Sequence, residues 1–119
     1  MSGNKTFTII KPDAFKSGYS GPIIKMIEDA GFSLKNMRLV RLDQESAGKF
    51  YAVHEDKPFF GRLCDYMCSG SIIVIELEKE NAVEDFRKLI GATNPDNAEE
   101  GTIRKLYATS IEANAIHGS

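Results

Sequence analysis

Six residues near the middle of the chain, Ile72-Ile73-Val74-Ile75-Glu76-Leu77, form a nearly continuous apolar run with several β-branched side chains. A run of this length and composition predicts a strand that is covered on both faces, and therefore a central strand of a sheet. Patterns typical of helices flank the run on both sides. The chain is thus expected to fold as a sheet with helices packed against it.

Two further strands and one helix are predicted before the central run. Residues 6–10 are β-branched and aromatic and stop at a Lys-Pro-Asp sequence, as expected of a strand that leads into a loop. An amphipathic helix follows, which begins at Ser20 or Gly21 and ends at Gly31. Residues 33–42 have the composition of a strand but place apolar side chains on both faces. This imperfect alternation suits a strand with one face covered by a partner subunit.

A pair of short helices is predicted between the second and third strands. Asp43 can cap the first, which runs to Tyr51, and Pro58 opens the second. Phe59 and Phe60 are adjacent, so their side chains point about 100° apart. Either both rings belong to the core, or one of them projects and offers a flat face to a base. The apolar stripe of the second helix comprises Phe59, Phe60, Leu63, Cys64 and Met67.

One helix, one loop and a last strand are predicted after the central run. Asn81 with Glu84 three residues later resembles a capping box, and the apolar spacing that follows predicts a helix that ends at Gly91. Residues 92–101 have the composition of a loop, and a loop this long in a compact domain is usually functional. Residues 106–111 are predicted to form the last strand, shortly before the C-terminal histidine.

The predicted order is strand, helix, strand, helical pair, strand, helix, strand. This order indicates an α+β, ferredoxin-like βαββαβ sandwich, in which a four-stranded antiparallel sheet carries helices on one face and a helical-hairpin insertion. Residues 1–119 are expected to form a single domain, because a chain of this size can bury one core. The fold alone does not define a function.

Composition excludes several classes of protein. Hydrophobic residues make up 42% of the chain and charged residues 27%, which is ordinary for a globular protein. The net charge is −2, so no general basic field exists to hold a nucleic acid. Cys64 and Cys68 are expected to be reduced thiols. Neither a signal peptide nor a membrane-length apolar run is visible, and we expect a cytoplasmic protein without a membrane partner.

The polar residues that suit phosphate chemistry are dispersed along the chain. Neither a P-loop sequence nor a Gly-x-Gly-x-x-Gly sequence after a strand occurs, so side chains would have to hold any phosphates. Arg87, Thr93 and Arg104 are suitable, since guanidinium groups match phosphate oxygens and a hydroxyl adds a neutral donor. Lys11 stands where a strand ends and can reach a ligand. His117 is a candidate nucleophile, because imidazole is partly neutral near pH 7.

The order and spacing of several short motifs resemble those of nucleoside diphosphate kinases over essentially the whole chain. No single motif is specific, but their combination is. The motifs are Thr6-Phe7-Thr8-Ile9-Ile10-Lys11-Pro12-Asp13, the segment from Tyr51 through His54 to Pro58-Phe59-Phe60, Met67-Cys68-Ser69-Gly70, Ile90-Gly91-Ala92-Thr93-Asn94-Pro95, Gly101-Thr102-Ile103-Arg104 and Asn114-Ala115-Ile116-His117-Gly118-Ser119.

This resemblance implies an activity and a role for each candidate residue. His117 would take the γ-phosphoryl group of a nucleoside triphosphate and pass it to a nucleoside diphosphate in a ping-pong cycle, with Mg2+ bridging the phosphates. The matching residues of the substrate site are Arg87, Thr93 and Arg104 for the phosphates, Lys11 and Asn114 for the sugar hydroxyls, Tyr51 beside the histidine, His54 near a phosphate, and Phe59 and Ile111 on either side of the base. Stacking accepts any base, so broad specificity is expected.

The sequence departs from the family pattern at a few positions. Ser71 stands where proline is common, Lys57 where arginine is common, and Val53 where an acidic residue is common. Relatives continue past the terminal Gly-Ser and supply a glutamate that hydrogen-bonds the histidine. Two interpretations follow: the tail lies outside this sequence, or this form is shortened, with reduced activity and assembly.

Two other functions and the assembly remain open at this point. A nucleotide-binding or regulatory module of the same fold would bind nucleoside diphosphates without becoming phosphorylated. A nucleic-acid-binding domain is disfavoured by the acidic balance and by the lack of paired exposed aromatics on strands. The resemblance also implies a homo-oligomer, a tetramer or hexamer built from dimers.

Overall fold

The computed structural model describes residues 3–111 and 113–118, so Ser119 lies outside the described residues. The strands are β1 (Lys5–Ile10), β2 (Ser33–Val40), β3 (Ile72–Glu78) and β4 (Ile116–Gly118). The α-helices are α1 (Pro12–Lys16), α2 (Ser20–Asp29), α3 (Gln44–Phe50), α4 (Phe60–Met67), α5 (Ala82–Ile90) and α6 (Ile103–Tyr107), and Ala52–His54 and Pro95–Asn97 form single 3-10 turns. In the described part of the chain no helix is long and apolar enough to cross a membrane.

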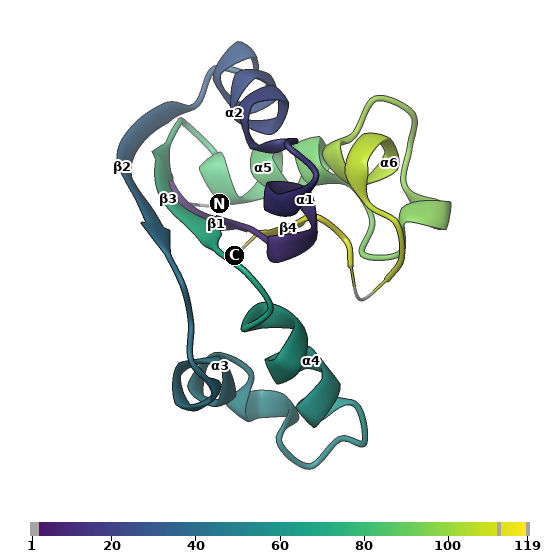
Figure 1. Ribbon diagram of the computed structural model, residues 1–119. Coiled ribbons are helices and arrows are strands. Elements are labelled where there is room, and N and C mark those ends of the chain that lie inside the picture. The colour runs from purple at the N-terminus through teal and green to yellow at the C-terminus, as the bar shows by residue number, and fades with distance from the viewer. Residues whose placement is uncertain (1–2, 112, 119) are drawn as a thin grey trace.

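The four strands form one antiparallel sheet in the order β2-β3-β1-β4 (Figure 1). The predicted central strand is confirmed, because β3 lies between β2 and β1. Both faces of β3 are covered in part, because Ile75 and Leu77 are fully buried on one face and Ile72 is fully buried on the other. The predicted ferredoxin-like α+β fold is therefore confirmed.

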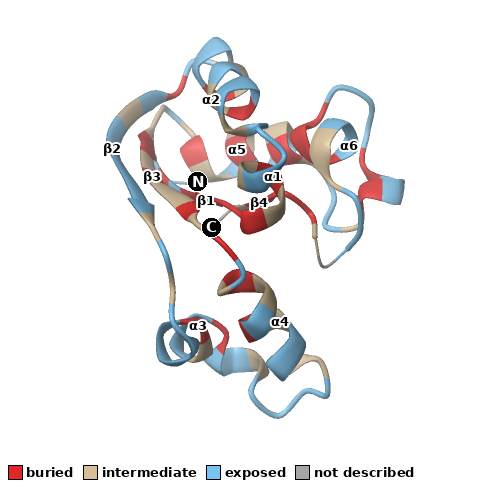
Figure 2. Cartoon of the chain, in the orientation of Figure 1, coloured by how far each residue is buried: buried red, intermediate tan, exposed pale blue. Residues whose placement is uncertain are grey.

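One face of the sheet packs against α2 and α5 and forms the main core (Figure 2). Ile23 and Ile27 supply the buried stripe of α2, and Phe86 and Ile90 supply that of α5. Burial of each such side chain stabilises the fold by about 2 kcal/mol. Since both helices lie on the same face, the opposite face is left for the helical hairpin.

The hairpin of α3 and α4 extends from the sheet between β2 and β3 (Figure 1). Asp43 caps α3 as predicted, because its carboxylate accepts a hydrogen bond from the N–H of Ser46. A second core joins the hairpin to the sheet, with Met67 of α4 packed in the same cluster as Ile9 and Ile72. The hairpin thus packs against part of the sheet face opposite α2 and α5.

The prediction of a last strand at residues 106–111 is wrong. Residues 103–107 form α6, which Thr102 caps by accepting a hydrogen bond from the N–H of Lys105, and Leu106 and Ile111 are exposed. The observed strand β4 has only three residues, too few to show an alternation in the sequence. Its position depends on pairing with β1, which the sequence pattern does not reveal.

Two other local predictions differ from the structure. Asn81 does not form a capping box: it adopts a left-handed φ of 59°, and its side-chain amide donates to Glu84 and Asp85. The Lys-Pro-Asp sequence was expected to end β1 in a loop, but Pro12 opens the short helix α1. Proline is compatible with this position because it lacks only an N–H that a first helical turn leaves unpaired.

We expect Gly91→Ala to lower the free energy of unfolding by about 2 to 3 kcal/mol, measured by urea denaturation. Gly91 ends α5 with φ of +89°, and a Cβ there would lie 2.6 Å from the hydroxyl oxygen of Thr102. Gly61→Ala is the control, because a Cβ at Gly61 in α4 meets nothing within 4 Å. That substitution is expected to stabilise slightly, by about 0.5 kcal/mol. Equal effects of the two substitutions would contradict the steric argument.

Candidate active site

The register of the sheet places His117 on the face that the hairpin covers. His117 is paired with Ile9 of β1, and Ile116 is paired with Ile10. Directly paired residues share a face, and successive residues alternate between faces. Ile116 therefore points into the main core with Ile10, while the imidazole of His117 lies on the opposite face, near the hairpin.

A tight turn fixes the backbone immediately before His117. Ala115 is fully buried with φ of 72°, a value that is uncommon for residues other than glycine. The N–H of Ile116 donates to the carbonyl of Asn114 at 2.8 Å, which closes a γ-turn centred on Ala115. The Ala115 carbonyl accepts from the N–H of Lys11 at 2.8 Å. Strained backbone persists only where its surroundings determine it, so this turn defines the direction of His117.

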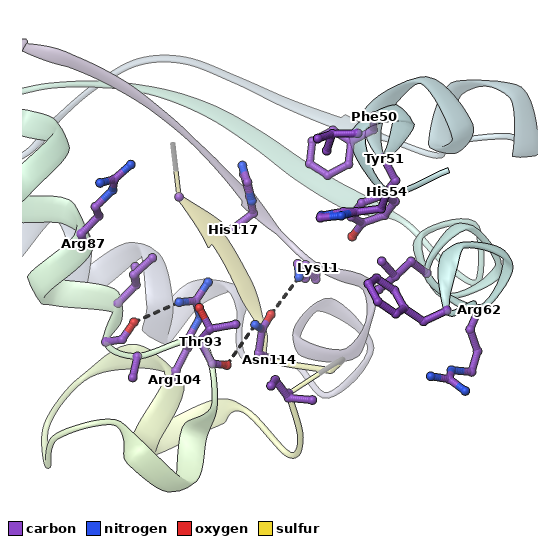
Figure 3. A pocket seen from close by; sticks show the side chains of 18 residues that line it. Lys11, Phe50, Tyr51, His54, Arg62, Arg87, Thr93, Arg104, Asn114 and His117 are labelled. Carbon is purple, nitrogen blue, oxygen red and sulfur yellow. Dashed lines mark hydrogen bonds between the residues drawn. The ribbon is translucent and has the colours of Figure 1, made fainter. Parts of the chain in front are cut away.

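A pocket of about 820 Å³ opens beside His117, a volume typical of small-molecule sites. Figure 3 shows His117 between Arg87 on one side and Phe50, Tyr51 and His54 on the other. The structure brings every predicted site residue into the lining of this one pocket. These residues are Lys11, Tyr51, His54, Phe59, Arg87, Thr93, Arg104, Ile111, Asn114 and His117.

A chain of hydrogen bonds joins three of the predicted residues. The ammonium of Lys11 donates to the side-chain oxygen of Asn114 at 2.8 Å, and the Asn114 amide donates to the carbonyl of Thr93 at 3.2 Å (Figure 3). Lys11 and Asn114 are buried, whereas Thr93 is exposed. The pair is therefore held in place without a ligand, and two further N–H groups of Lys11 stay available.

Arg104 connects two segments of backbone that border the pocket. Its terminal nitrogens donate to the carbonyls of Gly91 at 2.9 Å and Ile116 at 2.8 Å. Its Nε atom is buried and has no hydrogen-bond partner among the described residues. The sequence predicted that the guanidinium group of Arg104 binds phosphate oxygens. The structure leaves the second N–H of each terminal nitrogen for that purpose.

The electrostatics of the pocket favour a neutral histidine and an anionic ligand. Burial lowers the pKa of His117, and the positive charges of Lys11 and Arg104 lower it further. Burial also lowers the pKa of Lys11 to about 8, with a contribution from Arg104. The imidazole is therefore unprotonated at neutral pH, as a nucleophile must be. The described charged side chains of the lining are all cations, namely Lys11, Arg62, Arg87 and Arg104.

Aromatic rings from the hairpin line the other side of the pocket. Phe50 meets the His117 ring almost at right angles, with centroids 5.3 Å apart. The Tyr51 hydroxyl is buried without a partner among the described residues, and burial raises the pKa of Tyr51 to about 12. Rings of His54 and Phe59 lie 5.7 Å apart in a tilted arrangement. The hairpin thus provides flat apolar surfaces close to the cations.

Sequence analysis missed two notable lining residues, Phe50 and Arg62. Phe50 was assigned to the first helix of the hairpin, and no pattern showed that its ring would reach β4. Arg62 follows Phe59 by three positions, a spacing that places side chains on one face of a helix, and this signal was available. The guanidinium of Arg62 lies at the rim, away from His117 (Figure 3).

The fold and the pocket together define the class of protein, an α+β enzyme with a substrate that is small, anionic and partly flat. A nucleotide has these three properties. A sequence model of nucleoside diphosphate kinase matches residues 4–119. A nucleoside diphosphate kinase of Flavobacterium psychrophilum is 56% identical over 119 residues, which are 100% of this chain and 86% of that protein. One from Chlorobaculum tepidum is 55% identical over 115 residues, 97% of this chain and 82% of that protein.

Solved structures agree with these relatives. The nucleoside diphosphate kinase of Halobacterium salinarum in complex with CDP has a TM-score of 0.94 and 37% identity, over 98% of this chain and 78% of that chain. The enzyme of Aquifex aeolicus also gives a TM-score of 0.94 and 37% identity, over 98% of this chain and 84% of that chain. The chain belongs to the nucleoside diphosphate kinase family and is a phosphotransferase with nucleotide substrates. Nothing in these similarities favours a catalytically impaired module.

The buried ammonium of Lys11 gives a test of the site by its pH dependence. The folded pKa of about 8 lies below the ordinary value of 10.5, so between these pH values the unfolded state binds more protons than the folded state. Stability therefore rises with pH in this window. We expect the free energy of unfolding of the wild type, relative to Lys11→Met, to increase by about 3 kcal/mol from pH 8 to pH 10.5. Denaturant titrations at several pH values measure it.

Lys25→Met is the matched control for this measurement. Lys25 is exposed and its ammonium pairs with Asp29 at 2.5 Å, which raises the pKa of Lys25. A lysine with a raised pKa loses stabilising charge as pH increases, so the wild type should show no gain over Lys25→Met in the same window. If the difference in free energy of unfolding between the wild type and Lys11→Met does not change with pH, this result would contradict the burial of a charged Lys11.

Proposed function

We propose that His117 is the nucleophile of a ping-pong nucleoside diphosphate kinase. One nitrogen of the neutral imidazole attacks the γ-phosphorus of a nucleoside triphosphate, a nitrogen–phosphorus bond forms, and the bond to the bridging oxygen breaks as the diphosphate leaves. A second nucleoside diphosphate then takes the phosphoryl group by the reverse steps. The observation that carries the proposal is a neutral histidine, held by a strained turn, at the edge of a pocket lined by cations.

Three side chains would stabilise the transferring phosphates. Arg87 approaches His117 from α5, and Arg104 approaches it from α6, so the two guanidinium groups reach the same region from different elements (Figure 3). Thr93 adds a neutral hydroxyl from the loop after α5. Because catalysis of phosphoryl transfer is largely a matter of positioning and charge, fixed cations contribute most of the stabilisation.

The remaining residues would bind the nucleoside. Lys11 and Asn114 form a buried polar pair that suits ribose hydroxyls, and Lys11 can also approach the γ-phosphate. Phe59 would stack on one side of the base and Ile111 on the other, since both line the pocket. Contacts of this kind favour broad base specificity. Tyr51 would lie beside the imidazole, and His54 would contact a phosphate.

Magnesium would enter with the nucleotide. The described lining residues include no carboxylate, and no group of three or more His, Cys, Asp or Glu side chains converges in the described part of the structure. The site therefore fits an ion that is coordinated by phosphate oxygens. When bound, Mg2+ neutralises charge on the β- and γ-phosphates.

The open edge of the sheet supports a dimer as the unit of assembly. β2 is an edge strand, and Met37 and Leu39 on it are 51% and 62% exposed. An exposed strand edge with apolar side chains is a surface for pairing with another copy. We propose that a second copy covers β2, and that such dimers build a tetramer or hexamer. A cytoplasmic location would suit Cys64 and Cys68, which are free thiols.

Leu39→Glu is expected to shift the protein towards monomers, because a buried unpaired charge would disrupt the proposed contact. Native mass spectrometry over a range of concentrations measures the shift. Leu106→Glu is the control, since Leu106 is 54% exposed on α6, a different element. An unchanged assembly of Leu39→Glu would argue against an interface on β2.

The central test is intact mass after mixing the protein with ATP and Mg2+ under non-acidic conditions and without an acceptor. The wild type should gain the mass of one phosphoryl group and lose it when GDP is added, with GTP formed in equal amount. His117→Ala should gain nothing. His54→Ala removes the other histidine and should still gain one phosphoryl group, at a reduced rate. Phosphorylation of folded His117→Ala would assign the nucleophile elsewhere.

A further inference from the structure

A hydrogen bond outside the pocket links the hairpin to the sheet. The hydroxyl of Tyr66, near the end of α4, donates to a carboxylate oxygen of Asp13 in α1. The two residues are 53 positions apart in the sequence, and both are partly buried. Neither side chain lines the pocket among the described residues, so substrate binding does not explain the contact.

Asp13 also faces the turn that holds the nucleophile. Burial raises the pKa of Asp13, and the backbone N–H groups of Asp13, Ala14 and Ala115 near its carboxylate oppose that rise. The N–H of Lys11, two residues before Asp13, donates to the carbonyl of Ala115 at 2.8 Å. Ala115 is the strained centre of the γ-turn two residues before His117. The carboxylate of Asp13 therefore accepts a hydrogen bond from Tyr66 of the hairpin and also lies near the backbone of the turn.

The segment that joins α4 to β3 also packs against α1. A Cβ on Gly70, in the segment between α4 and β3, would lie 2.7 Å from Cε of Lys16 and 3.6 Å from Cβ of Pro12. This segment is thus in direct contact with both ends of α1. Because this segment follows α4 directly, the end of α4 lies close to α1, and the hydrogen bond between Tyr66 and Asp13 joins the two helices.

We propose that Asp13 and Tyr66 form a positioning pair, which fixes the aromatic wall of the hairpin relative to His117 and thereby aligns the nucleophile with the bound nucleotide. The hairpin carries Phe50, Tyr51 and Phe59, while the γ-turn carries His117. Both parts must keep one relative position for the phosphorus to lie in line with the imidazole. An error of about 1 Å in such an alignment can lower a rate by as much as about 100-fold.

Asp13 has a second effect, which acts through Lys11. The groups that face the Lys11 ammonium are Arg104 from α6, Asp13 from α1, and Asn114 and His117 from the C-terminal segment. Arg104 lowers the pKa of Lys11 and Asp13 raises it. Loss of the Asp13 charge should therefore let Lys11 lose its proton at a lower pH.

The inference rests on the proposed function, and single-turnover phosphorylation of the protein by ATP and Mg2+ tests it. The maximal rate and the nucleotide dissociation constant are measured separately, from pH 6 to pH 10. For Tyr66→Phe we expect a maximal rate about tenfold lower than that of the wild type and a dissociation constant within about twofold of it. The alkaline limb, which is the fall of the rate at high pH, should stay at the same pH. For Asp13→Asn we expect a similar loss of rate and an alkaline limb displaced to lower pH.

Asp65→Asn is the matched control. Asp65 precedes Tyr66 in α4, but its carboxylate accepts from Gln44 within the hairpin, so this change should leave the maximal rate and the pH profile unaltered. Thermal unfolding verifies that each variant is folded, and Tyr66→Phe keeps the ring.

A maximal rate of Tyr66→Phe equal to that of the wild type would overturn the inference, as would a loss confined to nucleotide affinity. The same holds for an alkaline limb that does not move in Asp13→Asn. If the wild type itself gains no phosphoryl group, the proposed function fails, and that result is distinct from any difference between variants.

Discussion

The γ-turn at Ala115 is the constraint on which the site depends. A left-handed residue other than glycine costs about 1 to 2 kcal/mol, so neighbouring groups must hold it. The N–H of Lys11 bonds the Ala115 carbonyl, Arg104 bonds the carbonyl of Ile116, and the hydroxyl of Thr8 donates to the carbonyl of His117 at 2.7 Å. Each of these groups comes from an element of the site or next to it. The turn therefore sets the direction of the imidazole and, through its partners, the positions of the nearby cations.

The cations beside the histidine are buried at a cost to the stability of the free protein. Burial lowers the pKa of Lys11 to about 8 and also lowers that of Arg104, which means that both charges are poorly solvated. A polyphosphate would supply the missing negative charge and would restore the proton affinity of Lys11. If the proposed substrate binds here, it would recover the stability lost to buried charge, a common compromise at active sites. Burial lowers the pKa of His117, and the same two charges lower it further.

Much of the fold was predictable, because its long elements carry periodic signals. The apolar run of β3 predicts a strand that is buried within the sheet, and the apolar stripe of α5 predicts which face of that helix packs against the sheet. The short elements were missed or misplaced for the opposite reason: β4 has three residues and α1 has five, so neither shows a period. In the site, residue types predicted which side chains could bind phosphates. They did not predict Phe50 against His117, because that contact depends on how the hairpin is placed over the sheet.

The topology explains why a site with no contiguous phosphate-binding loop can still be compact. β1 and β4 are neighbours in the sheet, so the ammonium of Lys11 and the amide oxygen of Asn114 come within 2.8 Å although they are 103 residues apart. Helix α5 packs beside β1 and β4 and adds Arg87, and the loop after it adds Thr93. Arg104 of α6 bonds the carbonyl of Ile116 in β4. Lys11, Asn114 and Arg104 are therefore already held by hydrogen bonds in the free protein. Preorganisation of this kind keeps the entropic cost of binding low and leaves more of the interaction energy for the transition state.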